Sequence, residues 1–492
     1  MPLKESELKS LFSKCISPSK LDVITARTVY NFCISPFMVY CDKFAPKDKK
    51  DPQTEHQKYL MELGLKHEKN IISSSYPDAE KFTYTSAEEG FKQVISGMNS
   101  GVRAISGAPI IYLPEGLEGI ADVIERRDSH PSIFGSYHYV VKEIKLAKNI
   151  QQHHILQTAF YNYIIGKIQK YTPPSFTIIN RDSILEEHPF IEKMVLDVIE
   201  QIRLIFKGTE VNPTYGACAW PWETFNDTEA IKRNDISLVA GIGPSTKIKM
   251  IEKGIKTVSD LANCSSRKLT QIKGIGDKKA RTFMLNAQAL EQRFHIKIAP
   301  CSFPLKSTEL FLDLEGTGES QSDEDFVPID YLIGVIKRDR SGTNYVSFVA
   351  HGLDKEGEMF HNFLDWLKKQ NDFIIYHWHH YEKTHVEKMI RRYIPTPEVT
   401  QLILGNMRDL YKDATASFAF PTYGNGLKQI AKYMGYQWKH ADVDALETIA
   451  MYQQYIENPK ENKENLQKII DYNQDDCMAT MTIKDWLVAN LK

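Results

Sequence analysis

Residues 119–128, GIADVIERRD, and residues 137–148, YHYVVKEIKLAK, decide the fold of the first part of the chain. The second stretch alternates in polarity, which predicts a strand with Glu143 and Lys145 on one side. Asp122 lies between two short apolar runs and indicates another strand. If these strands are neighbours, the two carboxylates and the ammonium meet, and such a trio can hold a divalent metal, activate a water molecule and stabilise the charge on a phosphate. The E-x-K spacing alone also fits the solvated face of an edge strand.

The overall composition is that of a multidomain globular protein. A chain of 492 residues is too long for one core, so two to four domains are expected, and 42% hydrophobic with 25% charged residues is ordinary for soluble domains. The net charge of −2 neither favours nor excludes nucleic acid. The start MPLKESELKS lacks the apolar region of a signal peptide, and no apolar run is long enough to span a membrane. Seven scattered cysteines without a C-x-x-C pair favour reduced thiols in a cytoplasmic protein.

Two predicted helices flank the opening stretch. Residues 57–73 have a helical pattern that contains His67, which could complete a metal site or simply lie on the surface. Residues 150–170 form a longer helical run in which Gln157 and Tyr161 share one face. Tyr161 could equally be part of the core, whereas Gln157 is harder to place there.

The histidine, the acids, the lysine and the Gln/Tyr pair described above follow one another along the chain in an order that resembles the RecB-type branch of the PD-(D/E)XK nucleases. The core of those nucleases is a restriction-endonuclease-like α/β fold. The motifs that carry the resemblance are His67, Asp122, Glu143-x-Lys145 and Gln157-x-x-x-Tyr161. The resemblance implies that the histidine and the two acids hold Mg²⁺ or Mn²⁺, that Lys145 assists the attacking water, and that Gln157 and Tyr161 contact the substrate. Many relatives also carry four cysteines that clamp an iron–sulfur cluster. Here Cys33 and Cys218 match two of them and the others are missing, so no iron–sulfur cluster is expected.

The middle of the chain, residues 235–298, contains a duplicated motif. Two G-I-G triplets, at 241–243 and 274–276, each follow an apolar run and precede a basic helix. The pattern resembles a tandem helix-hairpin-helix module, which binds the DNA backbone without reading sequence. The alternative is a packing motif between domains, and a Rossmann turn is disfavoured because no βαβ unit is evident. The residues expected to contact DNA are Gly241, Gly243, Lys247, Gly274, Gly276, Lys278 and Lys279.

The last third begins after a proline-containing linker at 298–306 with the strand TELFLDLEG, residues 308–316. This segment places Asp313 and Glu315 on one face, and Tyr472 and Asp476 lie one helical turn apart near the end of the chain. The order of elements resembles the RNase H-like 3′–5′ exonuclease fold of DEDD type. That resemblance implies a tyrosine that orients the attacking water and a set of metal-binding acids, here Asp313, Glu315, Glu382 and Asp476.

One motif departs from that family. The usual H-N-x-x-F-D reads HWHHYE here, so that Glu382 stands at the aspartate position and Trp378 at the asparagine position. Asp409 and Asp475 are possible substitutes for the missing aspartate. Acids that merely cap strands and helices in a structural domain are the alternative.

Together these segments resemble a group of bacterial RecB-like nucleases and predict an α/β multidomain chain. The expected domains are a RecB-type nuclease at 1–230, an all-α helix-hairpin-helix domain at 231–300 and an RNase H-like domain at 301–492. The predicted function is divalent-metal-dependent hydrolysis of DNA, on single strands or ends. The residues expected to carry it are Asp122, Glu143 and Lys145 in the dominant site, and Asp313, Glu315, Tyr472 and Asp476 in the second.

Two alternatives stay open at this stage. The chain could be a catalytically degenerate scaffold that binds nucleic acid and recruits a helicase or repair partner. It could also be an exonuclease that works through the C-terminal site on DNA or RNA. No membrane partner is expected in either case.

Overall fold

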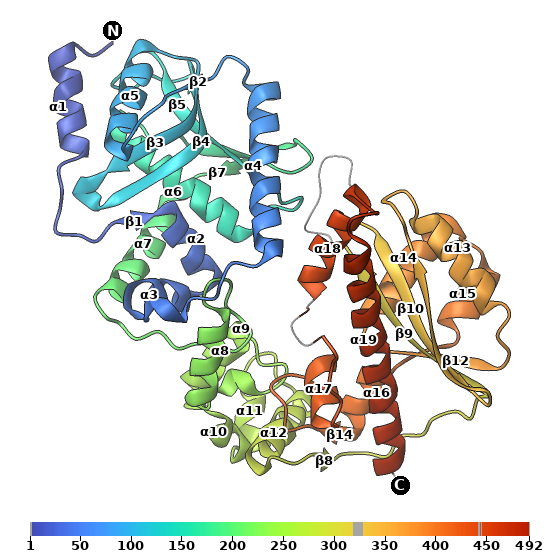
Figure 1. Cartoon of the computed structure of the whole chain (residues 1–492). Helices are drawn as coiled ribbons and strands as arrows, with labels where there is room; N and C mark the ends of the chain where they lie inside the picture. Colours follow the sequence, from blue (N-terminus) through green and yellow to red (C-terminus); the bar gives the residue numbers. More distant parts are fainter. Residues whose placement is uncertain (1, 318–327, 441–442, 444, 492) are drawn as a thin grey trace. The chain divides into compact units, whose positions relative to one another are not determined.

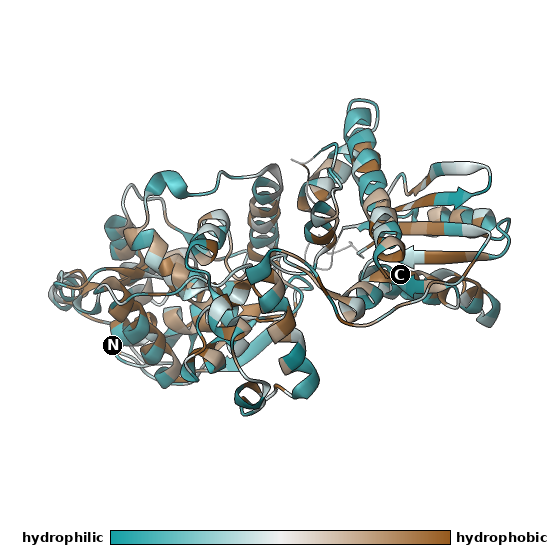
Figure 2. Ribbon diagram, turned by 90° about the horizontal axis from the view of Figure 1, so that it is seen from below, coloured by the Kyte–Doolittle hydropathy of each residue, from teal (hydrophilic) through white to brown (hydrophobic). Residues whose placement is uncertain are grey.

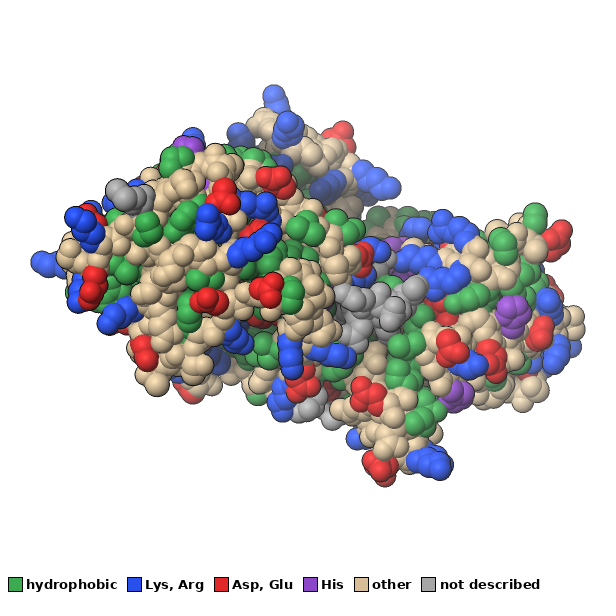
Figure 3. Space-filling model, turned by 90° about the horizontal axis from the view of Figure 1, so that it is seen from above, with side chains coloured by type: hydrophobic (Ala, Val, Ile, Leu, Met, Phe, Trp, Pro, Cys, Tyr) green, Lys and Arg blue, Asp and Glu red, His purple; other side chains and the backbone are tan. Residues whose placement is uncertain are grey.

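The computed structural model describes residues 2–317, 328–440, 443 and 445–491 (Figure 1). The chain divides into two compact units. The first covers residues 2–53 and 57–226, and the second covers residues 54–56 and the described residues from 227 onward. None of the helices in these ranges is both long and apolar enough to cross a membrane. On the face drawn in Figure 3, basic and acidic side chains are interspersed, in keeping with the nearly balanced charge of the sequence.

A mixed sheet forms the centre of the first unit. Its strand order is β2-β3-β4-β5-β6-β7, with β1 pairing parallel to β4. The strands are β1 (Ile24–Thr25), β2 (Glu80–Lys81), β3 (Ala104–Tyr112), β4 (Leu117–Arg127), β5 (His138–Ile144), β6 (Ser175–Ile179) and β7 (Leu185–Pro189). β3, β4 and β5 form an antiparallel meander, and β5 then pairs parallel to β6. The expected adjacency of the strands that carry Asp122 and Glu143 is therefore confirmed.

Helices pack around this sheet to make its core. They are α1 (Glu5–Cys15), α2 (Ala26–Ile34), α3 (Pro36–Phe44), α4 (Glu55–Ser75), α5 (Ala87–Ser100), α6 (Gln152–Gln169) and α7 (Glu192–Phe206). The hydroxyl of Thr25 accepts a 3.1 Å hydrogen bond from the Thr28 amide at the start of α2, and Pro36 begins α3. The crossover helix α6 connects β5 to β6 and contributes much of the buried cluster. Cys33 and Cys218 are half-buried thiols that pack against apolar neighbours.

Helix α8 (Glu223–Lys232) leads along the chain into the helix-hairpin-helix segment. This segment consists of the short helix at Ile236–Leu238, then α9 (Pro244–Glu252), α10 (Val258–Ala262), α11 (Ser266–Thr270) and α12 (Asp277–Gln292). Gly241 and Gly274 adopt φ values of +85° and +94°, which explains why both hairpins use glycine. Gly243 and Gly276 are the residues that precede α9 and α12.

A five-stranded sheet forms the rest of the second unit, in the order β11-β10-β9-β12-β13. The strands are β9 (Thr308–Gly316), β10 (Asp330–Asp339), β11 (Gly342–Val349), β12 (Phe373–His377) and β13 (Met407–Asp409). β9, β10 and β11 are antiparallel, whereas β12 and β13 run parallel to β9. The small ribbon of β8 (Ile296–Lys297) and β14 (Phe418–Ala419) joins the segment after α12 to this domain.

Both faces of this sheet are covered. The helices are α13 (Glu356–Leu367), α14 (Tyr381–Tyr393), α15 (Pro397–Leu404), α16 (Leu410–Ser417), α17 (Leu427–Tyr433), α18 (Ala445–Glu457) and α19 (Lys463–Asn490). α13, α14, α15 and α18 contribute to one core, and α16, α17 and α19 contribute to the other. In Figure 2 the strands of this sheet and α19 both carry brown and teal residues, which fits elements that bury apolar side chains and expose polar ones.

Candidate metal centre

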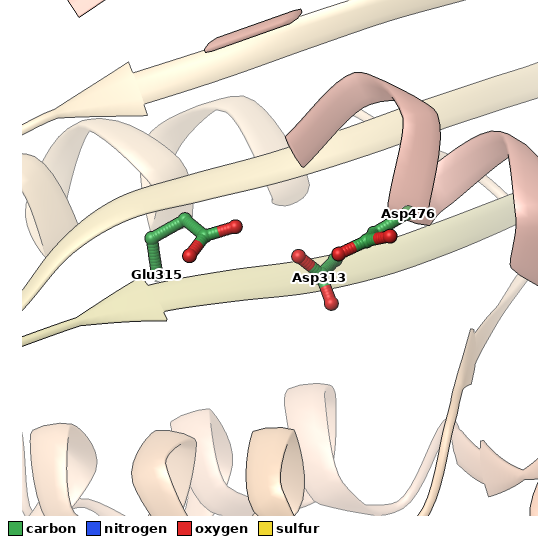
Figure 4. Close-up of side chains that lie close together, drawn as sticks. All are labelled: Asp313, Glu315 and Asp476. Atoms are coloured by element: carbon green, nitrogen blue, oxygen red, sulfur yellow. The ribbon is translucent and has the colours of Figure 1, made fainter. Parts of the chain in front are cut away.

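Strand β9 and helix α19 bring three carboxylates together. The alternation of β9 sends Leu310, Leu312 and Leu314 into one core, while Asp313 and Glu315 point to the other face with Phe311. Asp476 reaches them from α19 (Figure 4). One ligand atom from each of Asp313, Glu315 and Asp476 lies within 4.8 Å of the others. Oxygen ligands at this spacing suit a divalent cation such as Mg²⁺ or Mn²⁺.

Each carboxylate is held by a neutral hydrogen-bond donor. The Asn473 amide donates to Asp313 Oδ2 at 2.7 Å, and the Trp438 indole donates to Asp476 Oδ1 at 2.7 Å. The Thr448 hydroxyl lies 3.4 Å from Glu315 Oε2. Such donors fix the orientation of metal ligands without adding charge.

The protein balances the negative charges of the cluster only in part. Burial, followed by repulsion from Asp476, raises the pKa of Glu315 well above its usual value, and burial with repulsion from Asp476 and Glu315 does the same for Asp313. Burial also raises the pKa of Asp476 to about 6, although its hydrogen bond from Trp438 opposes the shift. Three buried acids that resist ionisation together need protons or cations, and a divalent metal supplies that compensation.

Two further side chains face the cluster. The hydroxyl of Tyr472 hydrogen-bonds to Asp476 one turn away on α19, and burial raises the pKa of this phenol. Lys428 on α17 places its Nζ 4.7 Å from the centre of the Tyr472 ring and lowers the pKa of both Glu315 and Asp476. A phenol and an ammonium group therefore lie next to the three carboxylates.

Glu382 lies outside the set of three gathered acids, although its charge helps to raise the pKa of Asp313. Its role as a metal ligand stays a prediction. Among the described residues, the gathered set contains only Asp313, Glu315 and Asp476. Glu382 is buried, and its Oε2 lies 3.5 Å from His377 Nδ1. The substitution in HWHHYE thus directs this longer side chain toward a neighbouring histidine.

The two possible substitutes have other partners. Asp409 caps α16 by accepting from the Lys412 amide at 3.3 Å and also accepts from the His379 amide at 3.2 Å. Asp475 accepts from the Tyr436 hydroxyl at 2.8 Å and from the Lys439 amide at 2.7 Å. Both acids therefore have hydrogen-bond partners of their own and lie outside the gathered set, and their role as substitute ligands stays a prediction.

The first unit contains a second polar site at the point where β4 and β5 separate. Asp122 Oδ2 accepts a 2.7 Å hydrogen bond from the Ile144 amide, and Lys145 Nζ lies 2.8 Å from Glu143 Oε1. Burial, then repulsion from Glu143, raises the pKa of Asp122 well above its usual value. The pKa of Lys145 is raised by Glu143 and Asp122 despite burial. The predicted trio is therefore brought together.

Helix α4 adds an acid that sequence analysis missed. Glu68 is half-buried, and its pKa is raised by burial and by Glu143, so it faces the trio. Its neighbour His67 is buried as well. Within the described ranges, however, His67, Asp122 and Glu143 do not gather into a three-ligand set like that of the C-terminal cluster. The position of Glu68 next to His67 was the available signal.

The two residues expected to contact substrate from α6 differ in exposure. Tyr161 is 5% exposed and belongs to the core of the first unit, and its pKa is raised by burial and by the charges of Glu143 and Asp122, so it lies beside the trio. Its role as a substrate contact stays a prediction. Gln157, one turn earlier on the same helix, is only half-buried.

In the helix-hairpin-helix segment, Lys278 and Lys279 are exposed in the first turn of α12, where phosphate contact was expected. Because Gly243 and Gly276 have no side chain, neither caps the amides that open α9 and α12. Lys247 is different: it is 4% exposed and its Nζ lies 2.6 Å from Asp235 Oδ2. This internal ion pair corrects the expectation that Lys247 contacts DNA.

Two family models match segments of the second unit. Residues 310–488 match the model of the RNase_H superfamily, and residues 234–288 match the model described as a SAM-like helix-hairpin-helix tandem. The chain thus combines a helix-hairpin-helix tandem with an RNase H-like domain that holds an acidic cluster. Both matches lie outside the first unit, where the RecB-type resemblance stays a prediction, as do the domain boundaries near 230 and 300. No curated protein matches the chain significantly.

Two solved structures show distant similarity. The family B DNA polymerase of the hyperthermophilic archaeon Pyrobaculum calidifontis is 18% identical over 38% of this chain and 25% of the polymerase, with a TM-score of 0.29. The protein SSO0001 is 17% identical over 42% of this chain and 88% of its own, with a TM-score of 0.17. The match therefore spans a quarter of the polymerase, and scores of this size carry no functional argument.

Proposed function

We propose that the chain is a divalent-metal-dependent nuclease that hydrolyses phosphodiester bonds of DNA, on single strands or strand ends, through Asp313, Glu315 and Asp476. The observation that carries the proposal is the gathering of these three buried acids within 4.8 Å. The helix-hairpin-helix tandem in the same unit supports DNA as the substrate.

In the proposed reaction, the side chains of the site have separate roles. The three carboxylates would hold the cation, with Asn473 and Trp438 orienting two of them. A bound divalent metal lowers the pKa of a coordinated water and offsets charge on the phosphate. Tyr472, hydrogen-bonded to Asp476, orients the attacking water, as the DEDD-type resemblance implies. The exposed lysines of α12 and the amides at the two helix starts hold the DNA backbone.

The test compares wild type with Asp313→Asn on single-stranded and double-stranded DNA whose 5′ or 3′ ends are blocked, with Mg²⁺, Mn²⁺ or EDTA. We expect cleavage to need metal and to fall by at least about 100-fold in the variant, because one of three ligands is neutralised. A preference for free 3′ ends would support 3′–5′ polarity. Cleavage that is unchanged in Asp313→Asn would contradict the assignment, and an RNA substrate tests nucleic-acid preference.

The first-unit site is a second candidate, and the contact between Lys145 and Glu143 beside Asp122 supports it. There Asp122, Glu143 and His67 would hold metal while Lys145 positions the water, as in the RecB-type nucleases. Lys145→Ala would then abolish a cleavage activity that survives in Asp313→Asn. If both variants and wild type bind DNA without turnover, the scaffold alternative with a helicase partner gains support instead.

A further inference from the structure

A pocket of about 440 Å³ opens beside the carboxylate cluster. Its volume lies within the range of roughly 300–1,000 Å³ that is common for small-ligand sites. It is formed by α17 and the segment that follows it. The lining residues are Lys428, Lys432, Gly435, Tyr436, Gln437 and Trp438.

Hydrogen bonds attach the wall of this pocket to the cluster. Tyr436 and Trp438 donate to the adjacent acids Asp475 and Asp476 on α19, at 2.8 and 2.7 Å. The two rings meet edge to face with their centres 4.9 Å apart. The pocket is therefore held at a fixed position next to one of the three candidate metal ligands.

Its charge is positive on one side. Lys428 and Lys432 are four residues apart on α17, so their side chains share one face of the helix. Lys432 is exposed, and Lys428 is half-buried beside the Tyr472 ring. One N–H of the Lys428 ammonium points to Val443 O at 3.3 Å, and an ammonium has three donors. A phosphate could thus approach both lysines while remaining near the acids.

We propose that this pocket binds a nucleotide of the DNA strand that is cut at the carboxylate cluster, with Lys428 and Lys432 contacting backbone phosphates and Tyr436 lying against the base. Lysines that follow a backbone and an aromatic ring that stacks on a base are the two features of sequence-tolerant single-strand binding. The proposal rests on the proposed function, because it deepens the substrate binding of the same site.

The first experiment is independent of cleavage. Full-length Asp313→Asn is irradiated with a single-stranded oligonucleotide that carries 4-thiothymidine at its 3′ end, and the cross-linked peptide is identified by mass spectrometry. We expect the cross-link within residues 428–438. Cross-links found only in other parts of the chain would overturn the proposal.

The second experiment is kinetic and uses the full chain. We expect Lys428→Ala and Lys432→Ala each to lower kcat/KM on single-stranded DNA by about tenfold and to reduce its salt dependence, with Lys428→Arg retaining more activity than Lys428→Ala. Lys369→Ala, an exposed lysine just after α13, is the matched control and should behave as wild type. Because Lys432 is exposed, its variant should fold normally.

The outcomes separate the two proposals. A wild-type protein that cross-links at 428–438 but never cleaves DNA would retain the pocket and reject the nuclease function. The opposite outcome is cleavage that depends on Asp313 while Lys428→Ala, Lys432→Ala and Lys369→Ala all behave as wild type. That result would reject the pocket and retain the nuclease.

Discussion

The indole of Trp438 donates a 2.7 Å hydrogen bond to Asp476 Oδ1 inside the second unit. Both side chains are buried, at 8% exposure each. The bond fixes the rotation of the carboxylate and favours its charged form, because it lowers the pKa that burial raises. A residue outside any recognised acid motif therefore tunes one of the three candidate metal ligands.

Replacing this tryptophan should weaken metal binding. Trp438→Phe keeps an aromatic ring but removes the N–H donor, so the pKa of Asp476 should rise further. We expect the Mn²⁺ concentration for half-maximal cleavage at neutral pH to increase by about tenfold or more, because a hydrogen bond to a charged group contributes roughly 1.5–3 kcal/mol. Metal titrations of cleavage and of thermal stability measure the change.

Trp366→Phe is the matched control for that experiment. Trp366 lies in α13 and packs against Phe348 and Phe363 on the other face of the sheet. Its substitution should leave the metal dependence unchanged. Equal metal requirements in wild type and Trp438→Phe would contradict the tuning role.

The stability of the metal-free protein should fall as the pH rises. The folded pKa of Asp476 is about 6, above the value of roughly 3.9 for an unfolded aspartate, so its protonated form is favoured in the fold. The stability that this protonation contributes is complete below about pH 4 and is lost as the pH rises through 6. For Asp476 alone, this contribution to the free energy of unfolding is of order 3 kcal/mol. Asp313 and Glu315 shift in the same direction.

Divalent metal should reverse this loss. The melting temperature is therefore expected to rise more on adding Mn²⁺ at pH 8 than at pH 5, and less in Asp313→Asn at pH 8, as differential scanning fluorimetry can show. A metal effect of the same size at both pH values would contradict the linkage between the cluster and the cation.

Local periodicity explains what sequence analysis found in the second unit. The period of two along β9 places Asp313 and Glu315 on one face, and the turn between Tyr472 and Asp476 in α19 follows from helical spacing. The strand adjacency of Asp122 and Glu143 was predicted in the same way. In each case the relation lies within one element or between consecutive strands.

Relations that depend on tertiary packing were missed. Trp438 and Thr448 reach the cluster from segments whose approach no local pattern encodes. Lys247 lies after a hairpin as expected, but the face of α9 that carries it turns inward to Asp235. The sequence predicts a dominant site at Lys145, whereas the family match and the gathered acids favour the C-terminal cluster.

The lysines that open α12 should control DNA affinity through salt. Each exposed lysine that neutralises one phosphate of a single strand contributes about 0.7 to the slope of log K against log salt. Lys278→Ala with Lys279→Ala should therefore reduce that slope by about 1.4 and weaken binding to all sequences alike. Fluorescence anisotropy at several salt concentrations measures it.

The control for that prediction is Lys256→Ala, an exposed lysine of the same segment that lies between α9 and α10. Its slope should stay within error of wild type if its side chain faces away from the DNA. A double variant at Lys278 and Lys279 with an unchanged slope would show that the hairpins do not hold the backbone there.

The close approach of α19 to β10 predicts the effect of one added methyl group. Gly334 pairs with Asp313 across the two strands, and a Cβ at this position would overlap the side chain of Asn473. In Gly334→Ala, Asn473 must therefore move and lose its 2.7 Å bond to Asp313. We expect a loss of about 2 kcal/mol in the free energy of unfolding and a fall in cleavage of at least about tenfold. Chemical denaturation and cleavage assays measure both.

Gly64→Ala in α4, where a Cβ meets nothing within 4 Å, should instead be neutral or slightly stabilising. Full activity in Gly334→Ala would mean that Asn473 does not position Asp313.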